Sequence, residues 1–208
     1  MRKLLPFVLL LGCGGSVETG TTPADGSVSE TTIEASVETS IEASTDAPRF
    51  DACDGPAQCI LAINGCCGKC GAPALSDWDA INKTQGDAHR AAVCTDPAPA
   101  CPKCATILDP NQIAFCRASR CKAIDVRLDA ISECATDSDC RLRAGNGCCE
   151  ACAVAETSQL IALSKSKGGE LEAQVCDPAA GACPPCVPTY PAGVTAICDP
   201  TTRHCKVK

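Results

Sequence analysis

The sequence predicts a small disulfide-rich fold in which a disordered linker precedes two tandem homologous modules, each with one helical segment and a short C-terminal β-hairpin. Three observations support this prediction. The chain has 21 cysteines among 208 residues, its aromatic content is 2%, and its C-terminal part repeats one cysteine spacing twice. A cysteine share this high is typical of a disulfide scaffold, and so few aromatic side chains exclude a large hydrophobic core.

The first twelve residues, 1–12, have the pattern of a signal peptide. Arg2 and Lys3 precede an apolar run from Leu4 to Leu11. This run is too short to span a membrane, which takes about 20 residues, and is typical of the apolar region of an export signal.

The residues that follow indicate a lipid anchor. Residues 10–13, Leu-Leu-Gly-Cys, resemble the lipobox of bacterial lipoproteins. The resemblance implies cleavage before Cys13, lipidation of the Cys13 sulfur and, because Gly14 and not aspartate follows, sorting to the outer membrane. An ordinary signal peptide with an incidental Cys13 is the alternative. We expect an exported outer membrane lipoprotein, held at the membrane by its lipid anchor, on the periplasmic or cell-surface face.

Residues 13–51 are expected to form the lipidated cysteine and a disordered acidic tether rich in Ser, Thr and Glu. Residues 14–51 contain no cysteine and carry eight acidic residues and one basic residue. Apolar residues recur at Ile33, Val37 and Ile41, but the β-branched, Ser/Thr-rich composition disfavours an isolated helix. Repulsion between the acidic side chains is expected to extend the segment.

The twenty cysteines after residue 51 form two sets of ten. Seven of the nine gaps between consecutive cysteines are identical in the two sets, including one of 23 residues. The sequence therefore predicts two modules, at residues 52–127 and 131–208. The first set is Cys53, Cys59, Cys66, Cys67, Cys70, Cys94, Cys101, Cys104, Cys116 and Cys121. The second set is Cys134, Cys140, Cys148, Cys149, Cys152, Cys176, Cys183, Cys186, Cys198 and Cys205.

We predict that these cysteines form five disulfides within each module, with the pairing left open. An exported chain leaves the reducing cytosol, and bacterial disulfides form in the envelope. Adjacent cysteines, Cys66 with Cys67 and Cys148 with Cys149, would make a strained ring if joined to each other. Each of these sulfurs should therefore have a different partner.

Two alternatives use the C-x-x-C spacings, such as Cys67–Cys70 and Cys101–Cys104. Two such pairs could hold a tetrahedral zinc, and each resembles a thiol oxidoreductase site. Exported thiols meet oxidants first, and no strand–helix–strand pattern of thioredoxin-like size is present. We therefore expect neither a metal nor a cofactor.

The 23-residue gap predicts a helix in each module. The helices are expected to begin near Ser76 and near Thr157. Gly86 and the Gly168-Gly169 pair lie in the middle of these segments and allow a break into two short helices. The residues expected near one face of the first helix are Trp78, Ile81, His89 and Val93. This apolar face is expected to pack on the cystines, with a partner-binding groove as the alternative.

Each module is predicted to end in a β-hairpin, at residues 114–124 and 196–207. Polar turn-forming residues, 117–120 and 199–204, separate apolar stretches in both.

Catalysis has little support in the sequence, and we expect no enzyme. The two histidines, His89 and His204, do not occupy equivalent places in the two modules, and both are expected at the surface. Asp137 and Asp139 form an acidic pair without an acidic equivalent in the first module, which disfavours a calcium loop. The net charge of −7 and the few aromatic residues disfavour nucleic acid as a partner.

The spacing Cys134-x5-Cys140, followed by Cys148-Cys149, resembles the first half of the whey acidic protein four-disulfide core, whose members include protease inhibitors. The resemblance ends at the 23-residue gap. It implies an alternative function, inhibition of secreted proteases, in which an exposed loop at 141–143 would present an arginine.

The whole chain resembles uncharacterised cysteine-rich lipoproteins of bacteria, which combine a lipobox, a Ser/Thr/Glu-rich spacer and a terminal hairpin. That resemblance implies no activity. We expect a membrane-anchored, envelope-exposed binding or structural protein, whose ligand would be a protein or a glycan.

Overall fold

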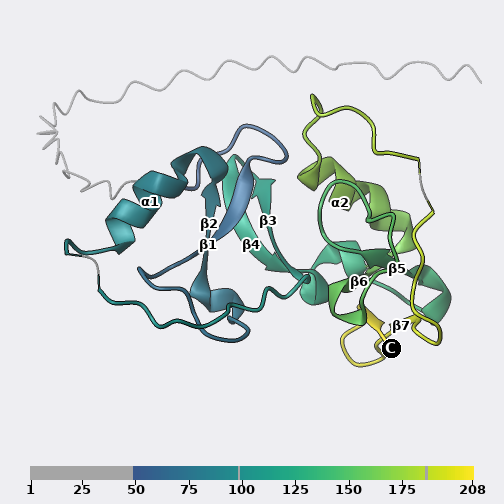
Figure 1. Ribbon diagram of the computed structural model, residues 1–208. Coiled ribbons are helices and arrows are strands. Elements are labelled where there is room, and N and C mark those ends of the chain that lie inside the picture. The colour runs from purple at the N-terminus through teal and green to yellow at the C-terminus, as the bar shows by residue number, and fades with distance from the viewer. Residues whose placement is uncertain (1–48, 98, 186) are drawn as a thin grey trace, which may run out of the picture. The chain divides into compact units, whose positions relative to one another are not determined.

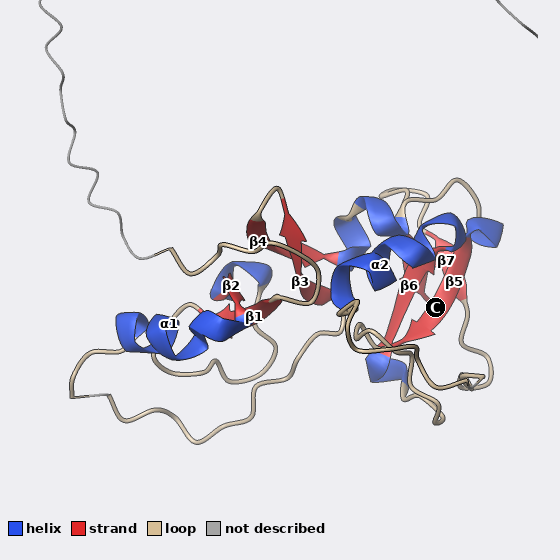
Figure 2. Ribbon diagram, turned by 90° about the horizontal axis from the view of Figure 1, so that it is seen from above, coloured by secondary structure: helices blue, strands red, loops and turns tan. Residues whose placement is uncertain are grey.

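The computed structural model describes residues 49–97, 99–185 and 187–208. The predicted signal peptide 1–12, Cys13 and nearly all of the tether 13–51 lie outside these residues. The described chain contains four two-stranded antiparallel sheets and two helices (Figure 1), joined by 3₁₀ turns and long loops (Figure 2). The strands are β1 (Cys59–Ile63), β2 (Trp78–Asn82), β3 (Gln112–Arg117), β4 (Arg120–Asp125), β5 (Cys140–Ala144), β6 (Leu160–Ser164), β7 (Ala196–Cys198) and β8 (Cys205–Val207). The helices are α1 (Gly86–Val93) and α2 (Gly168–Val175).

The same order of elements occurs twice along the chain. β1 pairs with β2, α1 follows, and β3 then pairs with β4. β5 pairs with β6, α2 follows, and β7 then pairs with β8. The hairpins predicted at 114–124 and 196–207 are confirmed as β3–β4 and β7–β8.

The helices are shorter than the sequence predicts. Trp78 and Ile81 lie in strand β2, so a helix that begins near Ser76 is wrong, and so is one that begins near Thr157, where β6 follows. A short apolar run fits a buried strand as well as a helix, and its periodicity alone does not separate the two. Pairing with β1, which sets Ile81 opposite Ile60, makes this run a strand.

The glycines have a different role from the one expected. Gly86 and Gly168 are the first residues of α1 and α2, not breaks in their middle. Before α1, the Asn82 side chain accepts a hydrogen bond from the Thr84 backbone N–H at 3.0 Å, which turns the chain from strand to helix.

The β3–β4 turn is a tight two-residue connection. Ala118 and Ser119 both have positive φ, 51° and 58°, which matches the twist of antiparallel strands. Arg117 and Arg120 lie opposite each other at this turn. The two Nη atoms of Arg117 donate to the Asp129 carboxylate at 2.6 and 2.9 Å, which ties the hairpin to the following 3₁₀ turns.

Nine disulfides join strands and loops of the described residues, and Cys152 is disulfide-bonded as well. Each of the nine closes within one of the two cysteine sets, and adjacent cysteines have different partners, as predicted. The prediction of a disulfide-rich fold is thus confirmed. The pairs are Cys53–Cys116, Cys59–Cys121, Cys66–Cys94, Cys67–Cys101, Cys70–Cys104, Cys134–Cys198, Cys140–Cys205, Cys148–Cys176 and Cys149–Cys183.

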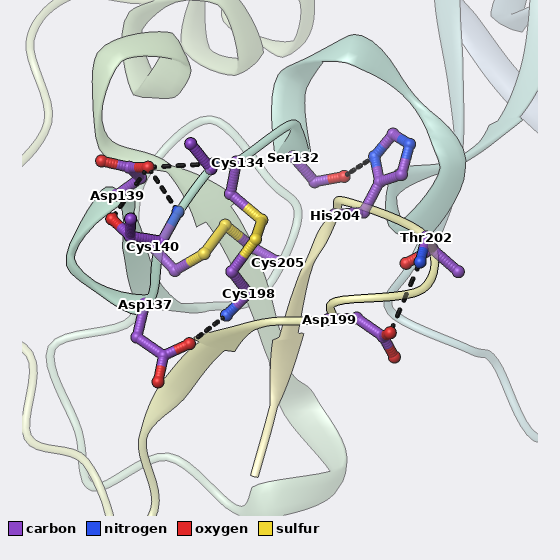
Figure 3. The surroundings of a disulfide bond; sticks show 12 residues. Ser132, Cys134, Asp137, Asp139, Cys140, Cys198, Asp199, Thr202, His204 and Cys205 are labelled. Carbon is purple, nitrogen blue, oxygen red and sulfur yellow. Dashed lines mark hydrogen bonds between the residues drawn. A yellow bond between two sulfur atoms is a disulfide. The ribbon is translucent and has the colours of Figure 1, made fainter.

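Two disulfides lie side by side where the C-terminal hairpin meets β5 (Figure 3). Cys134–Cys198 and Cys140–Cys205 bring the sulfurs of Cys134, Cys140 and Cys205 within 4.8 Å of one another. The backbone N–H of Cys198 donates to Asp137 Oδ1 at 2.9 Å. Sulfur and short apolar side chains together form a small core in this region.

A larger, mainly aliphatic cluster contains side chains from both repeats of the cysteine spacing. It joins β3 and β4 to β6, α2 and the 3₁₀ turns between them. Leu171 of α2 packs in this cluster and not on a cystine cluster as predicted. The buried members are Ile113, Phe115, Ile124, Val126, Ile131, Ile161, Leu163 and Leu171.

Replacing Phe115 with alanine should lower the free energy of unfolding by about 3–5 kcal/mol, because the ring is fully buried and its removal leaves a cavity. Guanidinium denaturation with the disulfides intact, followed by Trp78 fluorescence and far-ultraviolet circular dichroism, measures this loss. Leu128→Ala, at a leucine that is 68% exposed, should change it by less than about 0.5 kcal/mol. An unchanged midpoint for the Phe115 variant would contradict the role assigned to the cluster.

Candidate functional site

A groove of about 620 Å³ lies beside β1, β2 and β3, in contact with the end of α2. Its volume falls within the range of about 300–1,000 Å³ that is typical of sites for small ligands. The apolar side chains of its walls come from well-separated parts of the chain: Ile60, Leu61, Trp78, Leu108, Ile113 and Val175.

Hydrogen bonds within the protein hold three of the polar side chains of the groove, those of Trp78, Gln112 and Asn146. The indole Nε1 of Trp78 donates to Gln112 Oε1 at 2.6 Å, and Gln112 Nε2 donates to the Pro73 carbonyl at 3.1 Å. Asn146 Nδ2 donates to the carbonyl oxygens of Pro110 and Gln112, at 2.9 and 3.3 Å. These bonds orient the indole and fix the walls before any ligand arrives.

The groove walls are also fastened to one another. The backbone N–H of Ala57 donates to the Gln174 carbonyl of α2 at 2.9 Å. Cys59 lines the groove and is bonded to Cys121 of β4. A covalent bond and a backbone hydrogen bond therefore hold the wall around β1 in place.

Asp109 is the one charged residue among the described residues that line the groove. Its Oδ1 accepts from the backbone N–H and the side-chain amide of Asn111, both at 2.9 Å. Its Oδ2 accepts from Arg127 Nη2 at 2.8 Å. Both oxygens are thus engaged with the protein itself.

Among the described cysteines, three groups have sulfur atoms close enough together to hold a metal ion, and every cysteine in these groups is disulfide-bonded. The three groups with sulfurs within 4.8 Å of one another consist of disulfide-bonded cysteines, so they present no thiolate to a metal or a substrate. In the predicted C-x-x-C pairs, Cys67 is bonded to Cys101 and Cys70 to Cys104. The motifs therefore link two loops to each other.

His89 is buried, so its predicted place at the surface is wrong. Its Nε2 lies 2.9 Å from Asp79 Oδ2, and the Phe50 ring meets the imidazole edge to face, with centroids 5.4 Å apart. The positions equivalent to Asp79 and His89 in the second half are Ile161 and Leu171. A polar pair therefore connects α1 to β2 where an aliphatic pair connects α2 to β6.

His204 is half-buried, and its Nδ1 lies 2.9 Å from the hydroxyl of Ser132 (Figure 3). Ser132 is fully buried, and its hydroxyl donates to the Val126 carbonyl at 2.5 Å. Since the single hydroxyl proton is used there, the imidazole donates to the Ser132 oxygen. The pair closes a turn and offers no exposed nucleophile.

The residues expected to form an inhibitory loop, 141–143, lie in strand β5. Arg143 is 1% exposed, and its guanidinium donates to the carbonyls of Gly145, Gly147 and Cys148 at 2.7, 2.8 and 3.0 Å. Burial lowers the pKa of Arg143. Arg143 is therefore not accessible to a protease, because its side chain holds the neighbouring loop, whereas Arg141 of the same strand is partly exposed.

The groove was not predicted from the sequence, although Trp78 and the cysteines were singled out. A partner surface was expected only along a helix face, whereas the groove walls come mainly from strands and loops. The one available signal was the single tryptophan in a short apolar run. That signal does not show which distant residues, such as Val175 or Asn146, complete the walls.

Hydrogen bonds from Tyr190 and from β5 meet at Glu150, beside Ala144 of the groove lining. The Tyr190 hydroxyl donates to the Glu150 carboxylate, which also accepts from the backbone N–H of Ala144 at 2.8 Å. Burial and the hydrogen bond to Glu150 raise the pKa of Tyr190 to about 12.

Tyr190 is the single tyrosine, so the ultraviolet absorbance of tyrosinate reports it alone. We expect a titration midpoint near pH 12 in the folded protein and about 10 in the reduced, unfolded chain. The folded state holds this proton more tightly, so the contribution to stability is complete below about pH 10 and is lost as the pH rises towards 12. Glu150→Gln should lower the folded-state midpoint. A midpoint near 10 in the folded wild-type protein would refute the hydrogen bond between Tyr190 and Glu150.

The described residues indicate an exported protein. Nine disulfides are typical of secreted or extracellular chains. Among the residues that the structure describes, neither helix has the length and apolarity needed to cross a bilayer. Comparisons of the chain with protein families, with curated proteins and with solved structures find no match.

Proposed function

We propose that the protein is an outer membrane lipoprotein that binds a ligand in the groove beside Trp78. The observation that carries this proposal is the groove itself, an open apolar cavity in a frame held by disulfides. Ile60 and Leu108 at its rim are 41% and 71% exposed. Apolar side chains exposed around a concave site are typical of binding surfaces.

The proposal includes two tandem homologous modules. Four of the disulfides in the first half have counterparts at matching cysteines in the second half. Cys59–Cys121, for example, corresponds to Cys140–Cys205. The repeated cysteine spacing and the repeated order of elements support the same interpretation. The hairpin β3–β4 would end the first module and pack against the second.

The anchor in this proposal is a lipid on Cys13, carried by the acidic tether. The lipobox-like residues 10–13 support it, and an oxidising envelope suits the disulfides. The tether would hold the binding modules away from the membrane surface. The role is therefore binding, without bond-making chemistry of its own.

Metabolic labelling with an alkyne fatty acid tests the anchor. The wild-type chain should incorporate the label and enter the detergent phase on phase separation, because acyl chains bind strongly to apolar phases. Cys13→Ser should lose both properties while the intact mass still shows the disulfides. Label retained by the variant, or absent from the wild type, would remove the lipoprotein assignment.

Binding of the neutral fluorescent probe N-phenyl-1-naphthylamine tests the groove. In the Cys13→Ser background, the probe should quench Trp78 emission, and Ala151→Phe should weaken binding by about tenfold because it fills part of the groove. The matched control is Ala153→Phe, at an exposed alanine outside the groove lining, and it should bind like the parent. Equal binding by both variants, or none by the parent, would count against the groove as the site.

A further inference from the structure

We infer that the groove binds the aliphatic hydrocarbon chain of a lipid-like molecule and recognises it by burial of that chain, without contacts to a charged or sugar group. This inference rests on the proposed function, since it names the ligand class of the same groove.

The large side chains that line the groove are mainly aliphatic. Ile60, Leu61, Leu108, Ile113 and Val175 are branched aliphatic side chains, and Trp78 is the one aromatic residue among the described residues of the lining. Recognition of planar ligands commonly uses aromatic faces, of which this groove offers one. Aliphatic walls gain most from a flexible hydrocarbon, whose methylene groups each leave water on binding.

The described residues that line the groove offer no free charge to a ligand. Among the described lining residues, Asp109 alone is charged, and both of its oxygens already accept hydrogen bonds from Asn111 and Arg127. A charged group taken into this groove would lose its water without an ion partner in return. The charge pattern therefore selects an uncharged portion of the ligand.

The groove has few polar groups that could bind a ligand rich in hydroxyl groups. A sugar needs several polar groups that can exchange water for ligand contacts. Here the indole N–H of Trp78 is bonded to Gln112, whose amide N–H is bonded to Pro73, and the Asn146 amide is bonded to Pro110. These donors are used within the protein. Apart from Asp109, the other polar side chains of the described lining are Ser158, Gln159 and Gln174, and the buried Oε1 of Gln174 accepts no hydrogen bond from the described residues. Three such groups are few for a glycan, so the groove chemistry disfavours one.

The rim of the groove carries exposed apolar side chains. Ile107 precedes Leu108 in the chain, and both are among the most exposed large apolar residues of the described chain. An apolar rim lets a hydrocarbon chain enter while its polar head remains in water. The groove thus suits one chain of an amphiphile.

The test uses the full chain with Cys13→Ser, so that no acyl chain of its own competes. Hexanol, octanol and decanol are titrated while the emission of Trp78, the single tryptophan, is followed. The emission should shift to shorter wavelength, and affinity should rise about threefold to fourfold per added methylene group. Equal affinities for the three alkanols would overturn the inference.

Two matched variants locate the binding. Leu108→Asp places a charge at the groove wall and should weaken decanol binding by about tenfold or more. Leu128→Asp changes a similarly exposed leucine outside the lining, 68% against 71%, and should bind like the parent. Both sites are exposed, so both variants should fold, which circular dichroism checks. Equal losses in the two variants would contradict binding in the groove.

Two further titrations distinguish an error in the ligand class from an error in the binding site. A response of Trp78 to maltotriose, with none to the alkanols, would overturn the aliphatic ligand and leave the groove as a binding site. A response to phosphatidylglycerol vesicles, with none to monomeric alkanols, would overturn it in favour of bilayer docking. No response of Trp78 to alkanols, maltotriose, vesicles or N-phenyl-1-naphthylamine would refute the proposed function itself.

Discussion

In each cysteine set, a disulfide joins the first strand to the last and holds the intervening sheets and helix together. Cys59–Cys121 ties β1 to β4, and Cys140–Cys205 ties β5 to β8. An isolated two-stranded sheet is marginally stable in water, and the described chain contains only sheets of this size. Each disulfide typically contributes about 2–4 kcal/mol by restricting the unfolded chain. Covalent links therefore replace much of the apolar burial that a larger core would supply.

The groove lies on the outer side of the main aliphatic cluster. Ile113 belongs to the buried cluster and also lines the groove, and Val175 packs against the cluster from the groove wall. A change in the packing of β3 within the cluster would therefore also move Ile113 and Val175, which line the groove. Because the Cys59–Cys121 disulfide and the Ala57–Gln174 backbone hydrogen bond hold the wall around β1, this part of the cavity is formed in advance, which lowers the entropic cost of binding.

Buried polar groups distinguish the two halves of the chain. The first half has the Asp79–His89 pair where the second has Ile161 and Leu171, which belong to the aliphatic cluster. The second half instead buries Arg143, whose guanidinium donors occupy three loop carbonyls. Paired in this way, each polar side chain stabilises one local arrangement, since leaving its partners unbonded would cost about 1–3 kcal/mol. The two halves thus enclose different buried side chains.

The repeated cysteine spacing was enough to predict the disulfide-rich class and the closure of the described disulfides within each cysteine set. Turn residues between apolar stretches, which act over a few residues, predicted the two terminal hairpins. The three-dimensional fold was needed to show that Trp78 lies in a strand, that His89 and Arg143 are buried, and which cysteines are partners. These outcomes depend on pairing between distant segments: β1 makes a strand of a short apolar run that also fits a helix. The groove arises for the same reason, where residues from well-separated segments of the chain meet.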